Sequence, residues 1–222
     1  MQIADIGTKF GNSVSNIFDP WNPRIIHPYS IEELKNHLEQ TDLICFGGGE
    51  DISPSMYGHR NVSSGSAYNP SFRDLFEREV WKIAQTSKIP VLGICRGAQL
   101  TCVLSGGSLI QDVRGHCKTN SHTIKTLDGL KIDMSSYHHQ MMYCKNVDHL
   151  LLGWLDSKEF SVYTYDESKI KLLKPFLEPE VVFFPQTKAL GVQGHPEYSN
   201  DPFNESQEFT RNMVQHYLGV KP

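Results

Sequence analysis

The sequence predicts an α/β fold, with a mostly parallel sheet, helices on both faces of the sheet, and a small antiparallel extension in the second half. Two observations support this prediction: strand and helix patterns alternate through the first half, and strand-like segments joined by short polar turns dominate the second half. A chain of 222 residues without an internal repeat or linker is typical of one α/β domain, so we expect a single domain over residues 1–222.

The first half contains two helix-then-strand units. Ser30 and Glu33 form the pattern of a capping box, which predicts the start of a helix, and the apolar segment 43–46 then predicts a buried strand. Apolar residues at helical spacing between positions 75 and 84 predict a second helix, and Val91 to Ile94 a second strand. Repetition of this unit favours parallel strands covered by helices.

The second half begins after a helix predicted from about Ala98 to Leu104. Residues 181–184 and 189–193 have the pattern of a β-hairpin, and a C-terminal helix is predicted to end at Gly219. Residues 158–179 match no pattern to which we assign a role.

Composition excludes several classes of function. The formal net charge is −4, and no run of Lys or Arg would neutralise phosphates, which argues against nucleic-acid binding. No apolar run approaches the roughly 20 residues of a membrane span, and the first residues lack the pattern of a signal peptide, so we expect a cytoplasmic protein. Five cysteines without a CxxC pair argue against a disulfide framework and a structural zinc site.

One cysteine has the surroundings of a nucleophile. Cys95 lies in PVLGICRGAQL, where Gly93 and Gly97 flank it between a predicted strand and a predicted helix. This is the cysteine form of the G-x-S-x-G elbow, which exposes the nucleophile at the end of a strand, and a helix N-terminus favours the thiolate. The local pattern also fits a buried cysteine beside a tight turn, so the role of Cys95 depends on the rest of the chain.

A base and an oxyanion site are available in two other segments. His195 follows a predicted strand in GVQGHPE, and Glu197 is placed to accept the second ring N–H of His195. The loop FGGGEDISPSMYG presents bare backbone amides, so Gly48 or Gly49, together with the backbone N–H of Arg96, could stabilise an oxyanion. Taken alone, each segment also fits an ordinary surface turn.

In order, these segments resemble those of the class I glutamine amidotransferases, and within them the γ-glutamyl hydrolases of the peptidase C26 group. The matching segments are GGGEDISPSMYG, RDLFEREVWKIA, PVLGICRGAQL, SGGSLIQDV, SYHHQ and GVQGHPE. The resemblance implies a three-layer, flavodoxin-like fold. It also implies that Cys95 is the nucleophile, His195 the base and Glu197 its partner, with a γ-glutamyl thioester as intermediate.

The resemblance further suggests where the glutamyl group binds. Gln99 matches a position that lines the glutamine pocket, and Ser136, Tyr137 and His138 match a loop that meets the α-amino and α-carboxylate groups. The position of Cys102 usually holds Asn in this group, and the first strand is short and polar, so substrate selection is expected to differ.

We expect no metal and no cofactor. His138 and His139 could bind a metal, but adjacent histidines without a third spaced ligand are poor evidence, and we interpret His116 and His122 as ordinary loop histidines.

The function predicted from these residues is hydrolysis of a γ-glutamyl amide, which releases glutamate from a small-molecule substrate. The alternative is a glutaminase component that delivers ammonia to a partner synthetase. An inactive γ-glutamyl-binding relative is a third reading, disfavoured by the intact Cys, His and Glu set. Assembly with a synthetase or as a homodimer stays open.

Overall fold

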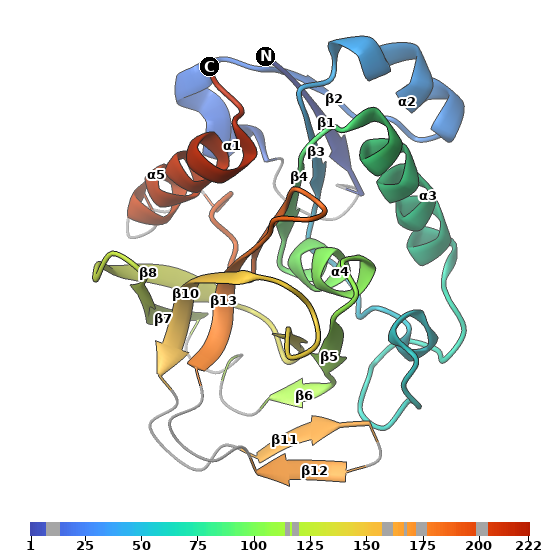
Figure 1. Cartoon of the computed structure of the whole chain (residues 1–222), viewed down its shortest axis with the longest axis vertical. Helices are drawn as coiled ribbons and strands as arrows, with labels where there is room; N and C mark the ends of the chain where they lie inside the picture. The colour runs from blue at the N-terminus through green and yellow to red at the C-terminus, as the bar shows by residue number, and fades with distance from the viewer. Residues whose placement is uncertain are drawn as a thin grey trace.

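The main sheet divides into a parallel half and an antiparallel half (Figure 1). The computed structural model describes residues 1–7, 14–113, 116, 120–156, 162–166, 168–171, 177–198 and 204–222. Within this part of the chain the sheet has nine strands, in the order β2 (Arg24–Ile26), β1 (Gln2–Ile6), β3 (Leu43–Phe46), β4 (Val91–Ile94), β14 (Ala189–Val192), β13 (Leu177–Phe184), β10 (Leu150–Asp156), β7 (Asn120–Thr126) and β8 (Lys131–Ser136).

The pairing of these strands confirms the predicted fold class. Neighbours from β2 to β14 are parallel, whereas β13, β10, β7 and β8 form the antiparallel extension. The predicted hairpin is β13–β14, in which Val181 pairs with Val192. The N-terminal segment, expected to be short and polar, contributes β1, whose five residues are all buried between β2 and β3.

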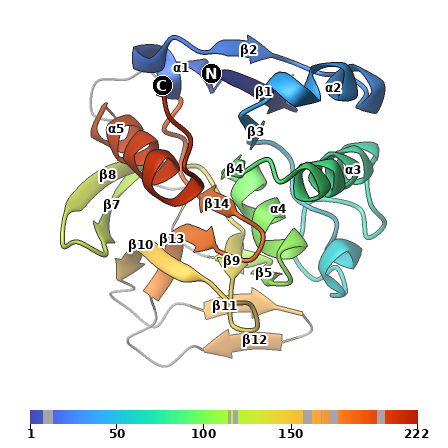
Figure 2. The same cartoon turned by 45° about the horizontal axis from the view of Figure 1, so that its top comes forward.

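Helices cover both faces of the parallel half, as Figure 2 shows. On one face lie α1 (Ser15–Phe18), α5 (Asn204–Met213) and the π-helical turn Val214–Leu218, and on the other lie α2 (Ile31–His37), α3 (Phe72–Ser87) and α4 (Arg96–Leu104). Residues of β3 alternate between the two cores, since Cys45 packs with α1 and α5, and Ile44 and Phe46 with α2, α3 and α4. The result is the three-layer arrangement expected.

The helix start predicted at Ser30 is confirmed by its cap, and α3 begins with a capping box that was not predicted. The Ser30 hydroxyl accepts a hydrogen bond from the Glu33 backbone N–H at the start of α2, and Ser71 and Asp74 form a full capping box on α3. The buried face of α3 differs from the apolar stripe predicted, because Asp74 and Glu77 are fully buried and Leu75 is 39% exposed. These two carboxylates have buried cationic partners, described below.

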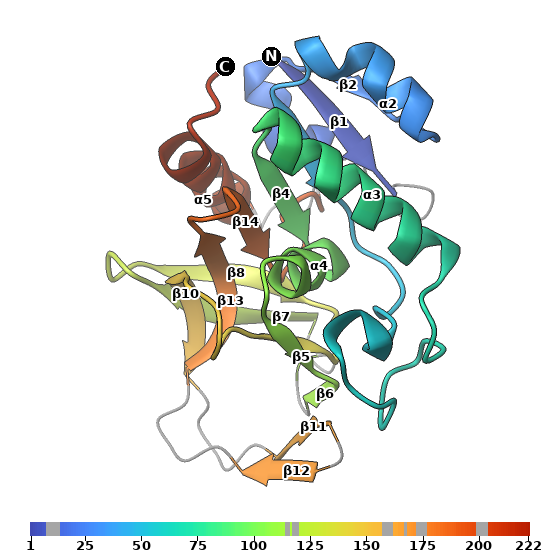
Figure 3. The same ribbon diagram turned by 45° about the vertical axis from the view of Figure 1, so that its right-hand side comes forward.

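Two smaller sheets lie beside the antiparallel half (Figure 3). One contains β12 (Ser168–Lys171), β11 (Val162–Tyr165) and β6 (Asp112–Val113), and the other contains β5 (Ser108–Ile110) and β9 (Met141–Tyr143). Part of segment 158–179, to which we assigned no role, therefore forms the hairpin β11–β12. Residues 177–179 of that segment begin β13, and its residues 158–161, 167 and 172–176, like Cys117, lie outside the described residues. No helix in the described part is long and apolar enough to cross a membrane.

Candidate active site

Cys95 occupies the sharp turn between β4 and α4. Its backbone has φ 52° and ψ −107°, a strained conformation for a residue with a side chain. Both flanking glycines are needed for this turn, since a Cβ on Gly93 would lie 2.2 Å from the carbonyl oxygen of Gly97, and a Cβ on Gly97 would lie 2.1 Å from that of Phe46. The local geometry is therefore that of the predicted elbow.

His195 follows β14 and is held in place on three sides. Its Nδ1 lies 2.7 Å from Oε1 of Glu197, and its backbone N–H donates to Oγ of Ser135 at 2.7 Å. Its ring stacks on Tyr198, with the two planes 3° apart. Burial lowers the pKa of His195, but hydrogen bonds to Cys95 and Glu197 outweigh burial and raise this pKa to about 10. At neutral pH the imidazole is therefore protonated, and its positive charge lies beside the sulfur of Cys95.

The glycine-rich loop touches both of these residues. A Cβ built on Gly48 would lie 2.6 Å from Cε1 of His195 and 3.6 Å from Cβ of Cys95. Gly49 has φ +151°, and a Cβ there would lie 2.1 Å from an Nη atom of Arg73. The structure thus brings together the three segments that the sequence predicted to form one site.

A buried ionic network, which the sequence did not reveal, supports this loop. Nη2 of Arg73 donates to the carbonyl oxygens of Gly47 and Gly48, at 3.3 and 3.0 Å. Nε of Arg73 donates to Glu77 at 2.8 Å, and Glu77 also accepts from the guanidinium of Arg96. Glu77 therefore joins the glycine loop to the first residue of the helix that follows Cys95.

Arg96 itself is fully buried. Besides Glu77, its guanidinium donates to Oδ1 of Asp74 at 2.6 Å, and Asp74 also accepts from the Ser53 hydroxyl at 2.7 Å. The side chain of Arg96 is thus directed into the network on α3, which leaves only its backbone N–H as the predicted oxyanion donor.

The predicted substrate residues occupy two different environments. Tyr137 is 47% exposed, and its ring centroid lies 6.3 Å from that of His195, so it borders the site. Gln99 is buried on α4, and its Nε2 donates to the carbonyl oxygen of Gln140 at 3.2 Å. Ser136 and His138 are buried, and both side chains contact His116: Ser136 donates to the carbonyl oxygen of His116, and His138 lies beside its ring.

The histidines near this loop differ from the interpretation made on sequence. His122 lies in β7 rather than in a loop, and His116, in a turn, is buried. Both lie next to His138 and Glu180, so His138 has neighbours in space with possible ligand atoms that its sequence position did not reveal. His139 lies apart from this group, with its Nε2 2.9 Å from Oδ2 of Asp51.

Comparisons with known proteins agree with this fold. The family model for peptidase C26 matches residues 22–197. The glutamine amidotransferase-like protein YvdE of Lactococcus lactis is 31% identical over 175 residues, which are 75% of this chain and 70% of YvdE. A glutamine amidotransferase structure from Thermotoga maritima superposes with a TM-score of 0.61 at 13% identity, covering 97% of this chain and 84% of that one.

A third relative is larger. The glutamine-hydrolysing GMP synthase of Clostridium perfringens is 24% identical over 201 residues, which are 89% of this chain but only 32% of the synthase. The fold and these matches define a member of the class I glutamine amidotransferase superfamily. Within that superfamily, the chain belongs to the peptidase C26 family.

Proposed function

We propose that this protein hydrolyses a γ-glutamyl amide, either glutamine or a γ-glutamyl conjugate of another amine, with Cys95, His195 and Glu197 as its catalytic residues. One observation carries the proposal. Cys95, in its strained turn, and His195, which is bound to the carboxylate of Glu197, both lie next to Gly48. Each part alone fits a structural role, but their convergence fits a nucleophile and its base.

The reaction proceeds in two steps. The Cys95 thiolate attacks the γ-carbonyl carbon, and as the C–N bond breaks, the imidazolium of His195 gives its proton to the leaving nitrogen. This step leaves a γ-glutamyl thioester. His195 then removes a proton from water, which attacks the thioester, so that glutamate leaves and the thiolate is restored. Glu197 holds the ring through Nδ1 and stabilises the imidazolium.

The oxyanion formed in each step needs hydrogen-bond donors. We assign this role to the backbone N–H of Arg96 and to one from Gly48 or Gly49. The buried network through Glu77 supports this assignment, because it fixes the glycine loop and Arg96 relative to each other.

The glutamyl group is assigned to the space bordered by Gln99 and Tyr137. Tyr137 lies beside His195 and is exposed, and Gln99 is one helical turn from Cys95. The side chains of Ser136 and His138 are buried against His116, so we assign them to support of this loop and not to direct contact with the substrate.

The test is hydrolysis by the purified chain alone. It should release glutamate from glutamine or from at least one of a set of γ-glutamyl amines, and Cys95→Ala should abolish the release. A glutamine-analogue electrophile should label Cys95 and not Cys45, because burial raises the pKa of the Cys45 thiol and keeps it unreactive. Equal glutamate release by the Cys95→Ala variant, or a label on Cys45, would exclude this mechanism.

The second candidate is a glutaminase component that passes ammonia to a synthetase. Similarity to the larger GMP synthase favours it, since the chain covers only a third of that protein. In that case glutamine hydrolysis by the isolated chain should be slow and should rise when the synthetase is added, and γ-glutamyl conjugates of bulky amines should not be cleaved.

The chain is proposed to act in the cytoplasm. Its four described cysteines are free, and Sγ of Cys102 lies 3.7 Å from Sγ of Cys144 as a pair of thiols. Reduced thiols at this separation are typical of a reducing compartment.

A further inference from the structure

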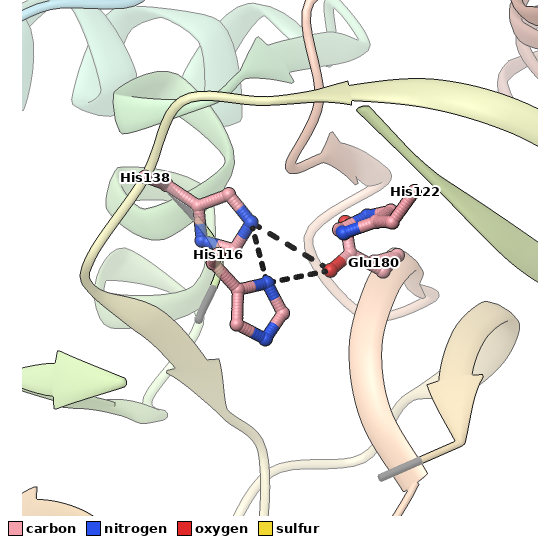
Figure 4. A group of neighbouring side chains, drawn as sticks. All are labelled: His116, His122, His138 and Glu180. Carbon is pink, nitrogen blue, oxygen red and sulfur yellow. Dashed lines mark hydrogen bonds and ion pairs between the residues drawn. The ribbon is translucent and has the colours of Figure 1, made fainter. Parts of the chain in front are cut away.

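Three histidines and a glutamate gather beneath the loop that carries Tyr137. His116 lies in the turn before β7 and His122 lies in β7. His138 follows β8, and Glu180 lies in β13 (Figure 4). One possible ligand atom of each lies within 4.8 Å of the others, and all four side chains are buried or nearly so. The catalytic mechanism proposed above uses none of them directly.

Hydrogen bonds on the outer side of this cluster fix which ring nitrogens face inward. Nδ1 of His138 lies 2.8 Å from the carbonyl oxygen of Gln140, which can only accept, so Nδ1 carries the proton and Nε2 presents a lone pair. Nε2 of His116 lies 2.9 Å from a carboxylate oxygen of Glu178, so in the neutral ring Nε2 carries the proton and Nδ1 presents a lone pair.

With both rings neutral, the inward-facing nitrogens and the carboxylate of Glu180 are all acceptors. Nδ1 of His116 and Nε2 of His138 are 3.2 Å apart, and Oε1 of Glu180 lies 3.7 Å from each of them. Neither carboxylate oxygen of Glu180 has a hydrogen-bond partner in the described part of the chain. Three buried lone pairs that face one another repel unless a positive charge lies between them.

The spacing of the cluster fits a tetrahedral metal ion. Ligand bonds of about 2.0–2.1 Å around Zn²⁺ place neighbouring ligand atoms about 3.3 Å apart, and the three separations above are 3.2, 3.7 and 3.7 Å. Nε2 of His122 lies 3.3 Å from the other oxygen of Glu180, Oε2, which makes it the candidate for a fourth ligand.

We propose that His116, His122, His138 and Glu180 form a binding site for one divalent transition-metal ion, Zn²⁺ being the best match. Three imidazoles and one carboxylate suit Zn²⁺, whereas Mg²⁺ and Ca²⁺ prefer sites made wholly of oxygen. The outer partners fit as well, because ligating histidines commonly donate their second N–H to a carboxylate or a carbonyl. Here Glu178 serves His116, and Glu178 is itself held by the Tyr163 hydroxyl at 2.5 Å.

The site joins parts of the chain that are far apart in sequence. A bound ion would connect the hairpin β7–β8 and the turn at His116 to β13. Strand β13 is the neighbour of β14, the strand that His195 follows. Its role is therefore structural support of the loop that carries Tyr137, since four protein ligands leave no open position for a substrate.

The experiment measures zinc bound to the untagged full-length protein. The protein is stripped with a chelator, reloaded with Zn²⁺, dialysed and analysed by mass spectrometry for metal content, and its affinity is measured against a chromophoric chelator. We expect about one zinc ion per chain. Glu180→Gln and His122→Gln should each weaken binding at least 100-fold, and Glu178→Gln should weaken it about 10-fold or more. His216→Gln, which changes an exposed histidine on the C-terminal segment, is the matched control and should bind as the wild type does.

A second measurement does not depend on the folding of any variant. Wild-type protein loaded with Co²⁺ should show the intense visible absorption of tetrahedral Co²⁺, and X-ray absorption of the zinc form should show nitrogen and oxygen ligands at about 2.0–2.1 Å. If the reloaded protein held no more zinc than a control protein without such a cluster, the proposal would be overturned. The His116 and His138 rings would then share a proton instead of a metal ion. Equal affinity in wild type, Glu180→Gln and His122→Gln, or an octahedral Co²⁺ spectrum, would overturn it too.

Discussion

Replacing Gly48 with alanine tests whether the glycine loop, Cys95 and His195 act as one site. The added Cβ would lie 2.6 Å from Cε1 of His195 and 3.6 Å from Cβ of Cys95, so the collision is with the imidazole and not with the nucleophile. The loop cannot retreat easily, because Arg73 donates to the carbonyl oxygens of Gly47 and Gly48. The imidazole must therefore move.

The size of this movement follows from the contact distance. Ordinary contacts of a Cβ begin at 3.4 Å, so the ring must shift by about 0.8 Å from its position at 2.6 Å. His195 is held by Glu197 at 2.7 Å and by stacking on Tyr198, so the shift disturbs the geometry of proton transfer. Misplacement by about 1 Å commonly reduces the rate about 100-fold, which is a loss of about 2.7 kcal/mol in transition-state stabilisation.

The assay is the release of glutamate from the best γ-glutamyl substrate, at a temperature well below the unfolding midpoint of the variant. We expect kcat/KM to fall about 100-fold, while the far-UV and near-UV circular dichroism spectra stay native. Gly65→Ala is the matched control, since a Cβ there would meet only Asp51, at 3.3 Å and beyond, and its activity should stay within threefold of wild type. Gly48→Ala activity within threefold of wild type would refute the convergence on which the proposed site depends.

Two further predictions concern the ionic groups around the site. Glu77→Gln should lower the free energy of unfolding by about 3 kcal/mol, because it removes one of two carboxylates from the buried guanidinium of Arg96, and urea titration that finds less than about 1 kcal/mol would contradict the network. His139→Gln should remove a stabilisation that depends on pH. A hydrogen bond to Asp51 raises the pKa of His139, and despite burial the same bond lowers the pKa of Asp51. Stability from the pair is therefore present between about pH 4 and 6.5, and it is lost as pH rises through the raised His139 pKa. Urea titrations of wild type and variant should differ by up to about 1 kcal/mol at pH 6 and converge as the pH rises through the raised His139 pKa, and a constant difference would contradict the assignment.

Local patterns in the sequence were sufficient for the parts of the fold that local physics determines. The cap at Ser30 and the elbow glycines Gly93 and Gly97 act within a few residues, and the structure places each as predicted. The hairpin β13–β14 likewise depends on a short turn between two apolar strands.

The parts that were missed depend on contacts between distant segments. Asp74 and Glu77 lie on a helix for which the sequence predicted only an apolar stripe, and the position of Arg96 explains why these two carboxylates are buried. The histidine cluster was missed for the same reason. His116, His122 and His138 have no regular ligand spacing in sequence, and the β7–β8 hairpin brings them together with Glu180.

The histidine cluster and the catalytic base are connected through the backbone of the sheet. The N–H of Gln193 donates to the carbonyl oxygen of Glu180 at 2.8 Å, and His195 follows two residues later. A second connection runs through β8. The backbone N–H of His195 donates to the hydroxyl of Ser135, and the hydroxyl of the next residue, Ser136, donates to the carbonyl oxygen of His116. A change at the cluster therefore reaches His195 through two chains of hydrogen bonds, and Cys95 is tied to the same strand because its backbone N–H donates to the carbonyl oxygen of Val192, the residue before Gln193. Removal of the ion proposed for this cluster should consequently lower kcat by displacing the imidazole of His195.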